Sequence, residues 1–334
     1  MQTLGLGAKI GYGVGDFGLN LYWQSLLLFI LFFQMDALGL SAVDAGLSYL
    51  VASIWDAGMD PLMGIISDRT RTRLGRYRPF ILFGTVPLAL SFWLCFSPPD
   101  FLVPGSAGML VFATLTHMGL RTCYAVVAIP YSSLTAAITR DSDERASLTG
   151  WRMLLAFAGA TLVSALLPLL AGWFGSYSPA AACIGVLAVA AHLACVASVR
   201  ELPPSAPAVA AAPLGLGADL GGFLRGVAGN GPLLRLLVAT VALHLSLGIL
   251  MRNVPYLLKY DLGGDAALAA QALTWFSAVG VAGVPLWVWV ARRWSKGAAW
   301  QAGSAMVIAG GVALAVTPPA GLWATLACLT LIFF

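Results

Sequence analysis

Long apolar stretches recur along the whole chain and alternate with short polar segments. A helix of about 20 apolar residues crosses a hydrocarbon core of about 30 Å. Residues 26–33 are apolar without a break, whereas the strands of a membrane barrel alternate apolar and polar positions. We therefore predict an all-α membrane protein. The ten expected spans are residues 12–35, 42–66, 79–97, 105–137, 148–172, 178–199, 232–258, 267–291, 299–317 and 321–334.

The composition favours a lipid environment. Hydrophobic residues make up 60% of the chain and charged residues only 10%, whereas a soluble domain carries about 25% charged residues. The five cysteines all fall inside predicted spans, where they are typical of small packing residues. We expect no cofactor, no dedicated metal centre and no nucleic acid partner.

Basic residues gather in alternate loops, which predicts an N-terminus in the cytoplasm by the positive-inside rule. The side of the N-terminus holds Lys9, Arg69, Arg71, Arg73, Arg76, Arg78, Arg140, Arg145, Arg200, Arg225, Arg235, Arg292, Arg293 and Lys296. The opposite side keeps essentially Arg252 and Lys259.

A Pro-, Ala- and Gly-rich segment divides the chain into two bundles. We expect an N-terminal six-helix bundle at 1–200, a cytoplasmic central loop at 201–231 and a partial C-terminal bundle at 232–334. Basic loops follow the second and the eighth predicted span, as in transporters built from two parallel repeats. The last apolar run continues to Phe334, so we expect a chain that lacks its C-terminal end.

The strongest candidates for chemistry are Asp56 and Asp60, four residues apart in the second span and therefore on one helical face. An ionisable group inside a bilayer is usually functional. Two carboxylates one turn apart can coordinate a hard cation or share a proton. The alternative is a pair of buried acids neutralised by Arg121 or Arg152 only to hold helices together.

Further polar and aromatic residues extend this candidate site. Arg152, near the start of the fifth span, can donate to sugar hydroxyls or to Asp56, or can extend towards the cytoplasmic surface. Arg121 lies in the middle of the fourth span and needs a partner, for which an acid of the second span is the nearest by topology. Asn20 is an expected polar contact of the sugar, and Trp23 or Tyr22 is the expected stacking contact. The three histidines occur singly and are read as packing residues.

The basic loop after the second span is a candidate cytoplasmic gate. Asp68 lies at the cytoplasmic end of its helix, where an arginine of the loop or of the fourth or fifth span can clamp the bundles together in the outward-facing state. The gate residues are Asp68, Arg69, Arg73 and Arg76. The alternative is that these charges only set topology.

The second span and its loop resemble a known family. Residues 54–64 read IWDAGMDPLMG and residues 73–79 read RLGRYRP, and the similarity extends through 9–18, 124–134 and Arg152. This pattern is similar to the glycoside-pentoside-hexuronide:cation symporters, the family of the bacterial melibiose permease within the major facilitator superfamily.

The resemblance implies a major facilitator fold of two six-helix bundles, with Asp56 and Asp60 as cation-site carboxylates. It also implies that Arg152 is a residue of the sugar cavity. Tyr124, the first residue of the similar segment 124–134, is a further candidate for substrate binding. Met59 and Ala125 replace two oxygen ligands of the family's sodium site. At the family's sugar-binding positions, three further replacements argue against a galactoside bound in the melibiose permease manner. They are Asn20, Ala128 and Ser132.

These features predict a secondary transporter that moves a sugar or glycoside with a proton by alternating access. Na⁺ at Asp56 and Asp60 is the alternative coupling ion, and a transport-inactive sensor or scaffold is the alternative function. A membrane enzyme is not expected, because no catalytic cluster lies near a membrane face. We expect a monomer, in contact with lipid, that spans a bacterial inner membrane many times.

Overall fold

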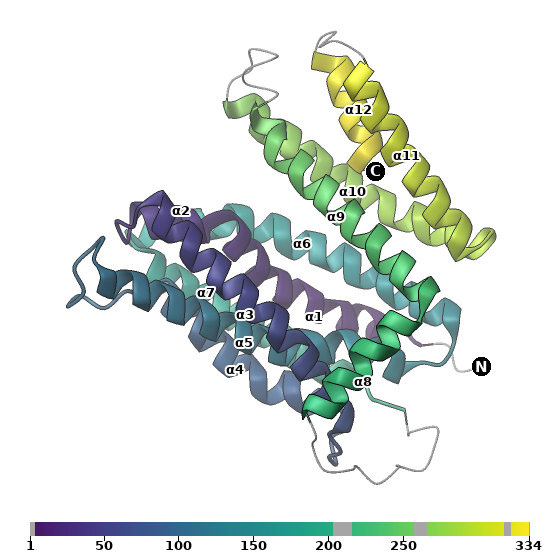
Figure 1. The fold of residues 1–334 in the computed structure, drawn as a ribbon, viewed down its shortest axis with the longest axis horizontal. Coiled ribbons are helices and arrows are strands. Elements are labelled where there is room, and N and C mark those ends of the chain that lie inside the picture. The colour runs from purple at the N-terminus through teal and green to yellow at the C-terminus, as the bar shows by residue number, and fades with distance from the viewer. Residues whose placement is uncertain (1–3, 203–215, 257–265, 317–321, 334) are drawn as a thin grey trace. The chain divides into compact units, whose positions relative to one another are not determined.

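The structure, a computed structural model, is all helical apart from one isolated bridge within residues 4–202, 216–256, 266–316 and 322–333, which are the residues it describes (Figure 1). The chain divides into two compact units, Met1–Ala211 and Ala212–Phe334, each of which is described by itself. The helices of unit 1 are α1 (Leu6–Ser25), a π-helical turn η1 (Leu26–Ile30), α2 (Leu31–Asp36), α3 (Ala42–Arg69), α4 (Arg78–Cys95), α5 (Ala107–Ile138), α6 (Ser142–Phe174) and α7 (Tyr177–Ser198).

Unit 2 contains α8 (Leu216–Gly229), α9 (Gly231–Tyr256), α10 (Ala266–Arg293), α11 (Lys296–Val316) and α12 (Leu322–Phe333). Helices α10, α11 and α12 pack on one another. The indole nitrogen of Trp275 on α10 donates to Thr330 on α12 at 3.1 Å. The segment expected to be a central loop therefore contains the helix α8.

Six helices among the described residues are long and apolar enough to cross a membrane. They are Leu6–Asp36, Arg78–Cys95, Ala107–Ile138, Ser142–Phe174, Tyr177–Ser198 and Lys296–Val316. Helix α3 has 28 residues, which at 1.5 Å per residue is long enough to span, but its acids lower its mean hydropathy. The count of ten spans stays a prediction.

Local sequence signals explain where the helices begin. The hydroxyl of Ser41 accepts from the backbone N–H of Asp44 at the start of α3, and Ser106 caps α5 in the same way. The carboxylate of Asp141 accepts two N–H groups at the start of α6. Such caps satisfy donors that have no partner within the helix.

Helix α1 packs against α6 and α7 through a row of glycines. A Cβ at Gly13 would lie 2.8 Å from the carbonyl oxygen of Trp151, and one at Gly15 would lie within 3.0 Å of Cys195 and the Tyr131 ring. On the facing helix, a Cβ at Gly159 would lie 2.6 Å from the carbonyl oxygen of Phe17. Small residues therefore let these backbones approach closely, as is common in membrane bundles.

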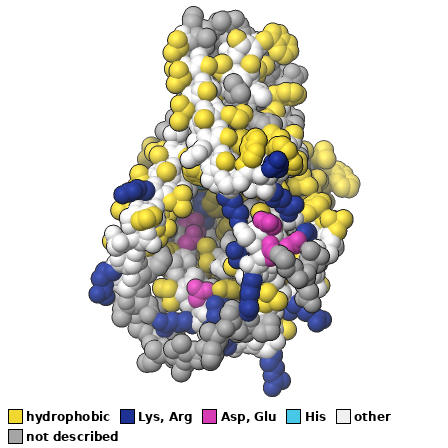
Figure 2. Space-filling view, turned by 90° about the vertical axis from the view of Figure 1, so that its right-hand side faces the viewer, with side chains coloured by type: hydrophobic (Ala, Val, Ile, Leu, Met, Phe, Trp, Pro, Cys, Tyr) yellow, Lys and Arg dark blue, Asp and Glu magenta, His cyan; other side chains and the backbone are white. Residues whose placement is uncertain are grey.

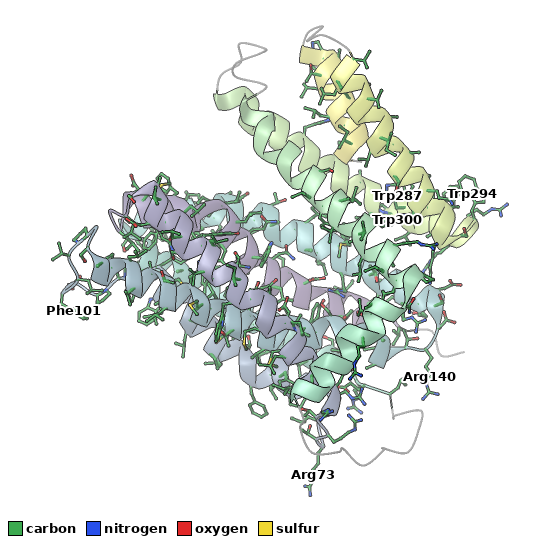
Figure 3. All side chains as sticks on the ribbon, in the orientation of Figure 1. Arg73, Phe101, Arg140, Trp287, Trp294 and Trp300 are labelled. Atoms are coloured by element: carbon green, nitrogen blue, oxygen red, sulfur yellow. The ribbon has the colours of Figure 1, made fainter. Side chains whose placement is uncertain are left out.

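The two ends of unit 1 differ in charge. Arg73 and Arg140 lie towards the end that carries the N-terminus, and Phe101 lies at the opposite end (Figure 3). Figure 2, which faces the side where the N-terminus lies, shows many Lys and Arg side chains with Asp and Glu among them. The connections around Phe101, residues 96–106, contain no Lys or Arg.

Candidate functional site

An ion pair between α3 and α5 forms the centre of the candidate site. Nη1 of Arg121 donates to Oδ2 of Asp56 at 3.0 Å, and only 4% of the Arg121 side chain is exposed. The partner that topology suggested for Arg121 is therefore the one the structure shows. The other carboxylate oxygen of Asp56 is buried and has no hydrogen-bond partner among the described residues. A pair of this kind is held by mutual attraction against a large desolvation cost.

Aromatic rings enclose the Arg121 guanidinium. Its central carbon lies 4.8 Å from the ring centre of Trp23 on α1 and 5.5 Å from that of Tyr49 on α3. The rings of Trp23 and Tyr124 lie 5.4 Å apart. Cation–π attraction at such distances adds to the ion pair. The structure thus brings Trp23, Tyr124, Arg121 and Asp56 together, whereas Tyr49 was not anticipated.

Asp60 lies one turn beyond Asp56 on α3 and is only partly buried. Among the described residues, no ion pair involves Asp60. The two carboxylates that the sequence presents as equivalent are therefore different: one is engaged by an arginine and the other is not.

A second ion pair, between α1 and α6, lies nearer than the first to the end of unit 1 that carries the basic loop. Nε of Arg152 donates to Oδ2 of Asp16 at 2.7 Å, and Nη1 donates to the Thr135 hydroxyl at 3.2 Å. Of the two acceptors expected for Arg152, the sugar stays a prediction and Asp56 is not the one contacted here, because Asp16 is its partner. Asn20 donates its amide to the Asp16 carbonyl at 2.9 Å, so this expected sugar contact is engaged by its own helix.

Two tyrosines bind α1 to α5 beside this pair. The Tyr12 hydroxyl donates to the Tyr131 carbonyl at 2.9 Å, and the Tyr131 hydroxyl donates to the Tyr12 carbonyl at 2.8 Å. Their rings stack with centres 4.9 Å apart. The Arg152 guanidinium lies 4.8 Å from the Tyr131 ring centre. These reciprocal hydrogen bonds and the stacked rings hold α1 against α5 beside the second ion pair.

His117 is a member of the first cluster that sequence reasoning read as a packing residue. Nε of Arg121 donates to Nε2 of His117 at 3.4 Å, and the imidazole lies 5.4 Å from the Tyr49 ring. The imidazole Nδ1 is buried with no partner among the described residues. The spacing of four residues between His117 and Arg121 could have revealed the contact, since such residues are neighbours on a helix.

Two acids contact the basic loop after α3: Asp68 at the end of α3, and Glu201, which follows α7. The Tyr77 hydroxyl donates to Asp68 at 2.7 Å, and Arg76 lies 3.8 Å from the same carboxylate. The Glu201 carboxylate accepts the backbone N–H groups of residues 76–78 at 2.7–3.0 Å. A carboxylate at a helix N-terminus is favourable for the free donors and for the dipole. Glu201 was not anticipated.

The other predicted gate residues differ in exposure. Arg73 is exposed, and Arg69 is partly buried and makes a contact of its own. The Asp68 side chain is 61% exposed, so its pairing with Arg76 is a surface contact, of a kind worth about 1 kcal/mol or less. The gate role stays a prediction.

The described residues offer no group of three or more His, Cys, Asp or Glu side chains able to hold a metal ion. Near Asp56 and Asp60, Met59 and Ala125 contribute no side-chain oxygen. Because Na⁺ requires several oxygen ligands, these two carboxylates alone do not make a complete sodium site.

Comparisons with known proteins agree with this architecture. Residues 11–334 match the family described as MFS/sugar transport protein. A putative glycoside/cation symporter from Escherichia coli (strain K12) is 39% identical over 186 residues, which is 53% of this chain and 40% of that protein. An isoprimeverose transporter from Lactiplantibacillus pentosus is 35% identical over 192 residues, 57% of this chain and 39% of that protein. The chain thus spans about two fifths of the length of these curated relatives.

A solved structure with the same fold is that of a proton:xylose symporter bound to 6-bromo-6-deoxy-D-glucose. The TM-score is 0.64 at 15% identity, over 98% of this chain and 77% of the other. The likeness confirms the major facilitator fold that the sequence predicted.

Proposed function

The chain belongs to the MFS/sugar transport protein family, a family of transporters and not of enzymes, and on that premise we propose that it moves a sugar or glycoside together with a cation by alternating access. The observation that carries the proposal is the buried Asp56–Arg121 pair with the unpaired Asp60 one turn away. Charged side chains at membrane depth are expensive and usually mark an ion or substrate path.

Two groups of side chains support binding of a sugar. Trp23 and Tyr124 present apolar rings beside the Arg121 guanidinium, and Arg152 offers planar donors suited to hydroxyl groups. In this structure Arg152 and Asn20 are occupied by Asp16. Substrate contact by these engaged donors therefore requires rearrangement of the Asp16 cluster, which would couple binding to a change in the packing of α1 on α6.

The proton is the coupling ion that these residues favour. Arg121 already occupies one oxygen of Asp56, and Met59 and Ala125 supply no replacement ligand, so Na⁺ would lack most of its oxygen shell. A proton requires only one carboxyl group. An unpaired carboxylate costs far more than the neutral acid in an apolar environment, so we assign the proton to Asp60 and make Asp56 its partner in the cycle.

Uptake into proteoliposomes tests this function. Labelled isoprimeverose and a labelled methyl glucuronide are offered under an inward proton gradient, and separately under an inward sodium gradient. We expect accumulation of a glycoside with the proton gradient and its loss on addition of a protonophore. Accumulation that follows sodium and ignores the protonophore would overturn proton coupling. Binding without exchange of either sugar would instead support the sensor or scaffold alternative.

The membrane orientation is testable with single cysteines. In a background without native cysteines, Asp44→Cys at the start of α3 is expected to react with an impermeant maleimide added outside intact cells, whereas Thr72→Cys in the basic loop should react only after permeabilisation. The reason is that basic loops remain in the cytoplasm. Labelling of Thr72→Cys from outside would reverse the topology.

The same two cysteine reporters test the gate when Asp68→Asn is added. If Asp68 is part of a clamp, the substitution should change the maleimide reactivity of the cysteine at position 72.

A further inference from the structure

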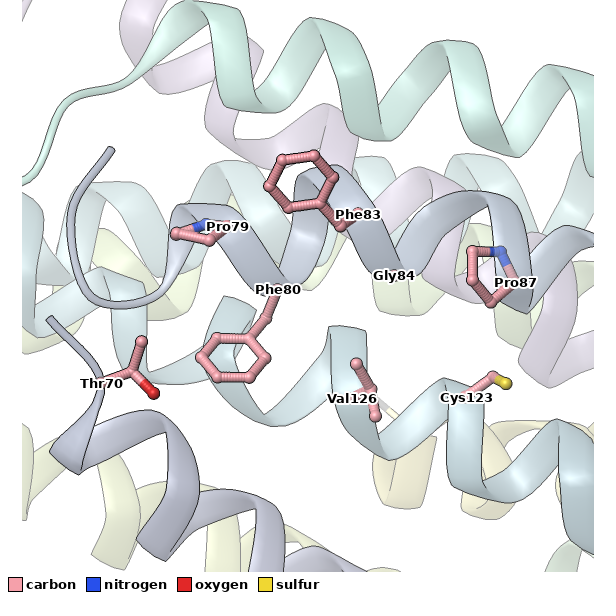
Figure 4. A pocket seen from close by; sticks show the side chains of 8 residues that line it. All are labelled: Thr70, Pro79, Phe80, Phe83, Gly84, Pro87, Cys123 and Val126. Atoms are coloured by element: carbon pink, nitrogen blue, oxygen red, sulfur yellow. The ribbon is translucent and has the colours of Figure 1, made fainter. Parts of the chain in front are cut away.

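An apolar groove lies on the surface of unit 1, at the end that carries the basic loop. Helices α3 and α4 both pack on α5, and the groove of about 450 Å³ is bordered by the end of α3, by α4 and by α5 (Figure 4). Its border includes Thr70, Phe80, Phe83, Pro87, Cys123 and Val126. The Thr70 hydroxyl donates to the Ile66 carbonyl, so the groove presents almost no unsatisfied polar group.

Gly84, at the border of the groove, lets α4 approach α5 closely. A Cβ there would lie 2.9 Å from Val127 and 3.1 Å from Val126 of α5. The Phe83 ring beside it is 69% exposed. Helix α4 is long and apolar enough to cross a membrane, so we expect this exposed ring to face acyl chains rather than water.

The length of the groove matches one leaflet. It begins at Pro79, in the first turn of α4, and reaches Pro87. Eight residues of helix rise about 12 Å, which is close to half of a hydrocarbon core of about 30 Å. The groove therefore extends from the membrane surface towards the bilayer centre, as a single acyl chain does.

The mouth of the groove is strongly basic. Thr70 and Pro79 border it, and between residues 68 and 78 the chain carries five arginines and only one acid, Asp68. Glu201 adds one carboxylate, and it is engaged by backbone N–H groups. Arg71 and Arg73 are exposed, and Nη1 of Arg71 donates to the backbone carbonyls of Asp68 and of Thr70 at the border of the groove. Arginines at the membrane surface attract anionic lipid, and their planar donors match a phosphate.

From this juxtaposition we propose that the groove binds one acyl chain of an anionic phospholipid whose phosphate is held by Arg71 and Arg73. The apolar groove selects a chain, and the excess positive charge at its mouth selects an anionic headgroup. A zwitterionic lipid satisfies only the first requirement, and a free phosphate or headgroup satisfies only the second. The proposal is independent of whether the chain transports a sugar.

Native mass spectrometry of the purified chain in detergent tests the proposal. The probes are dioleoyl phosphatidylglycerol, dioleoyl phosphatidylcholine and glycerophosphoglycerol, which is the anionic headgroup without its chains. We expect one phosphatidylglycerol to be retained in excess of a random adduct distribution. Phosphatidylcholine should be retained more weakly, and glycerophosphoglycerol should not compete.

Two variants separate the headgroup from the chain. Arg71→Gln/Arg73→Gln should weaken retention of phosphatidylglycerol by roughly fivefold per arginine, and Arg225→Gln/Arg235→Gln, which removes the same charge from exposed positions of unit 2, should not. Val126→Trp fills the groove and should reduce retention of the lipid, whereas Val86→Trp, at an exposed position of α4 outside the groove border, should not. The arginine variant changes only exposed side chains of the loop, so the test stands even if Val126→Trp does not fold.

Three results would overturn the proposal. They are equal retention of the two lipids, unchanged retention in the arginine variant, and competition by glycerophosphoglycerol as effective as that by the intact lipid. The last result would indicate an anion site without an acyl-chain groove.

Discussion

Replacing Asp56 by Asn is expected to abolish proton-driven accumulation of the transported glycoside. The substitution removes one of the two carboxyls proposed for coupling and leaves Arg121 without its counter-ion. Breaking a buried ion pair by removing one partner costs about 3–5 kcal/mol. The single variant alone therefore does not separate loss of coupling from loss of the fold.

A double variant makes that separation. Asp56→Asn/Arg121→Gln removes both charges and leaves no unpaired ion in the cluster, so most of the stability lost in the single variant should return. If Asp56 takes part in coupling, the double variant folds but does not accumulate sugar against a gradient. It should still exchange labelled for unlabelled sugar, since exchange requires binding and reorientation but no net proton movement.

The control is Asp100→Asn, which changes an exposed acid in the loop between α4 and α5 and should leave uptake unchanged. Melting temperature, counterflow and accumulation are measured on the same preparations. A double variant that accumulates sugar like the parent would show that the pair serves only to hold α3 on α5. Asp60→Asn, which breaks no ion pair, should lose accumulation without a comparable loss of stability.

The helices were predictable from sequence because lipid imposes a simple rule on length and polarity. The expected span at 79–97 became α4 (Arg78–Cys95), and the one at 148–172 became α6 (Ser142–Phe174). Helix α6 begins earlier than expected because its first turn is polar and is capped by Asp141. Helix α8 was missed because its segment follows a proline-rich stretch and is too short to appear as a span.

The parts of the candidate site that depend on residues of one helix were predictable from the sequence. The contacts that depend on how different helices pack were not. The turn that joins Asp56 to Asp60 follows from helical periodicity, and the need of Arg121 for an acid follows from its depth. Arg152 pairs with Asp16 rather than Asp56 because α1 lies close to α6. The pattern of apolar and polar residues along the sequence does not show which helices lie close together. Glu201 likewise meets residues 76–78 across more than 120 positions of sequence.

That close approach predicts a large effect from a single methyl group. In Gly159→Ala, the new Cβ would lie 2.6 Å from the Phe17 carbonyl oxygen and 3.2 Å from its Cα. Both are backbone atoms, so α1 and α6 must separate. Phe17 follows Asp16 directly, so the separation should also disturb the Asp16–Arg152 contact at 2.7 Å.

Overpacking of this kind lowers the free energy of unfolding by about 1–3 kcal/mol. The better helix propensity of Ala over Gly offsets up to about 1 kcal/mol of this loss. We therefore expect Gly159→Ala to melt several degrees lower, at about 2–4 °C per kcal/mol. The measurement is thermal unfolding in detergent with a thiol-reactive dye, which reports exposure of the buried Cys95 and Cys195. The matched control is Gly172→Ala on the same helix, where a Cβ meets nothing within 4 Å and the melting temperature should stay the same or rise. Equal melting of the two variants would show that α1 and α6 do not pack at the distance seen in this structure.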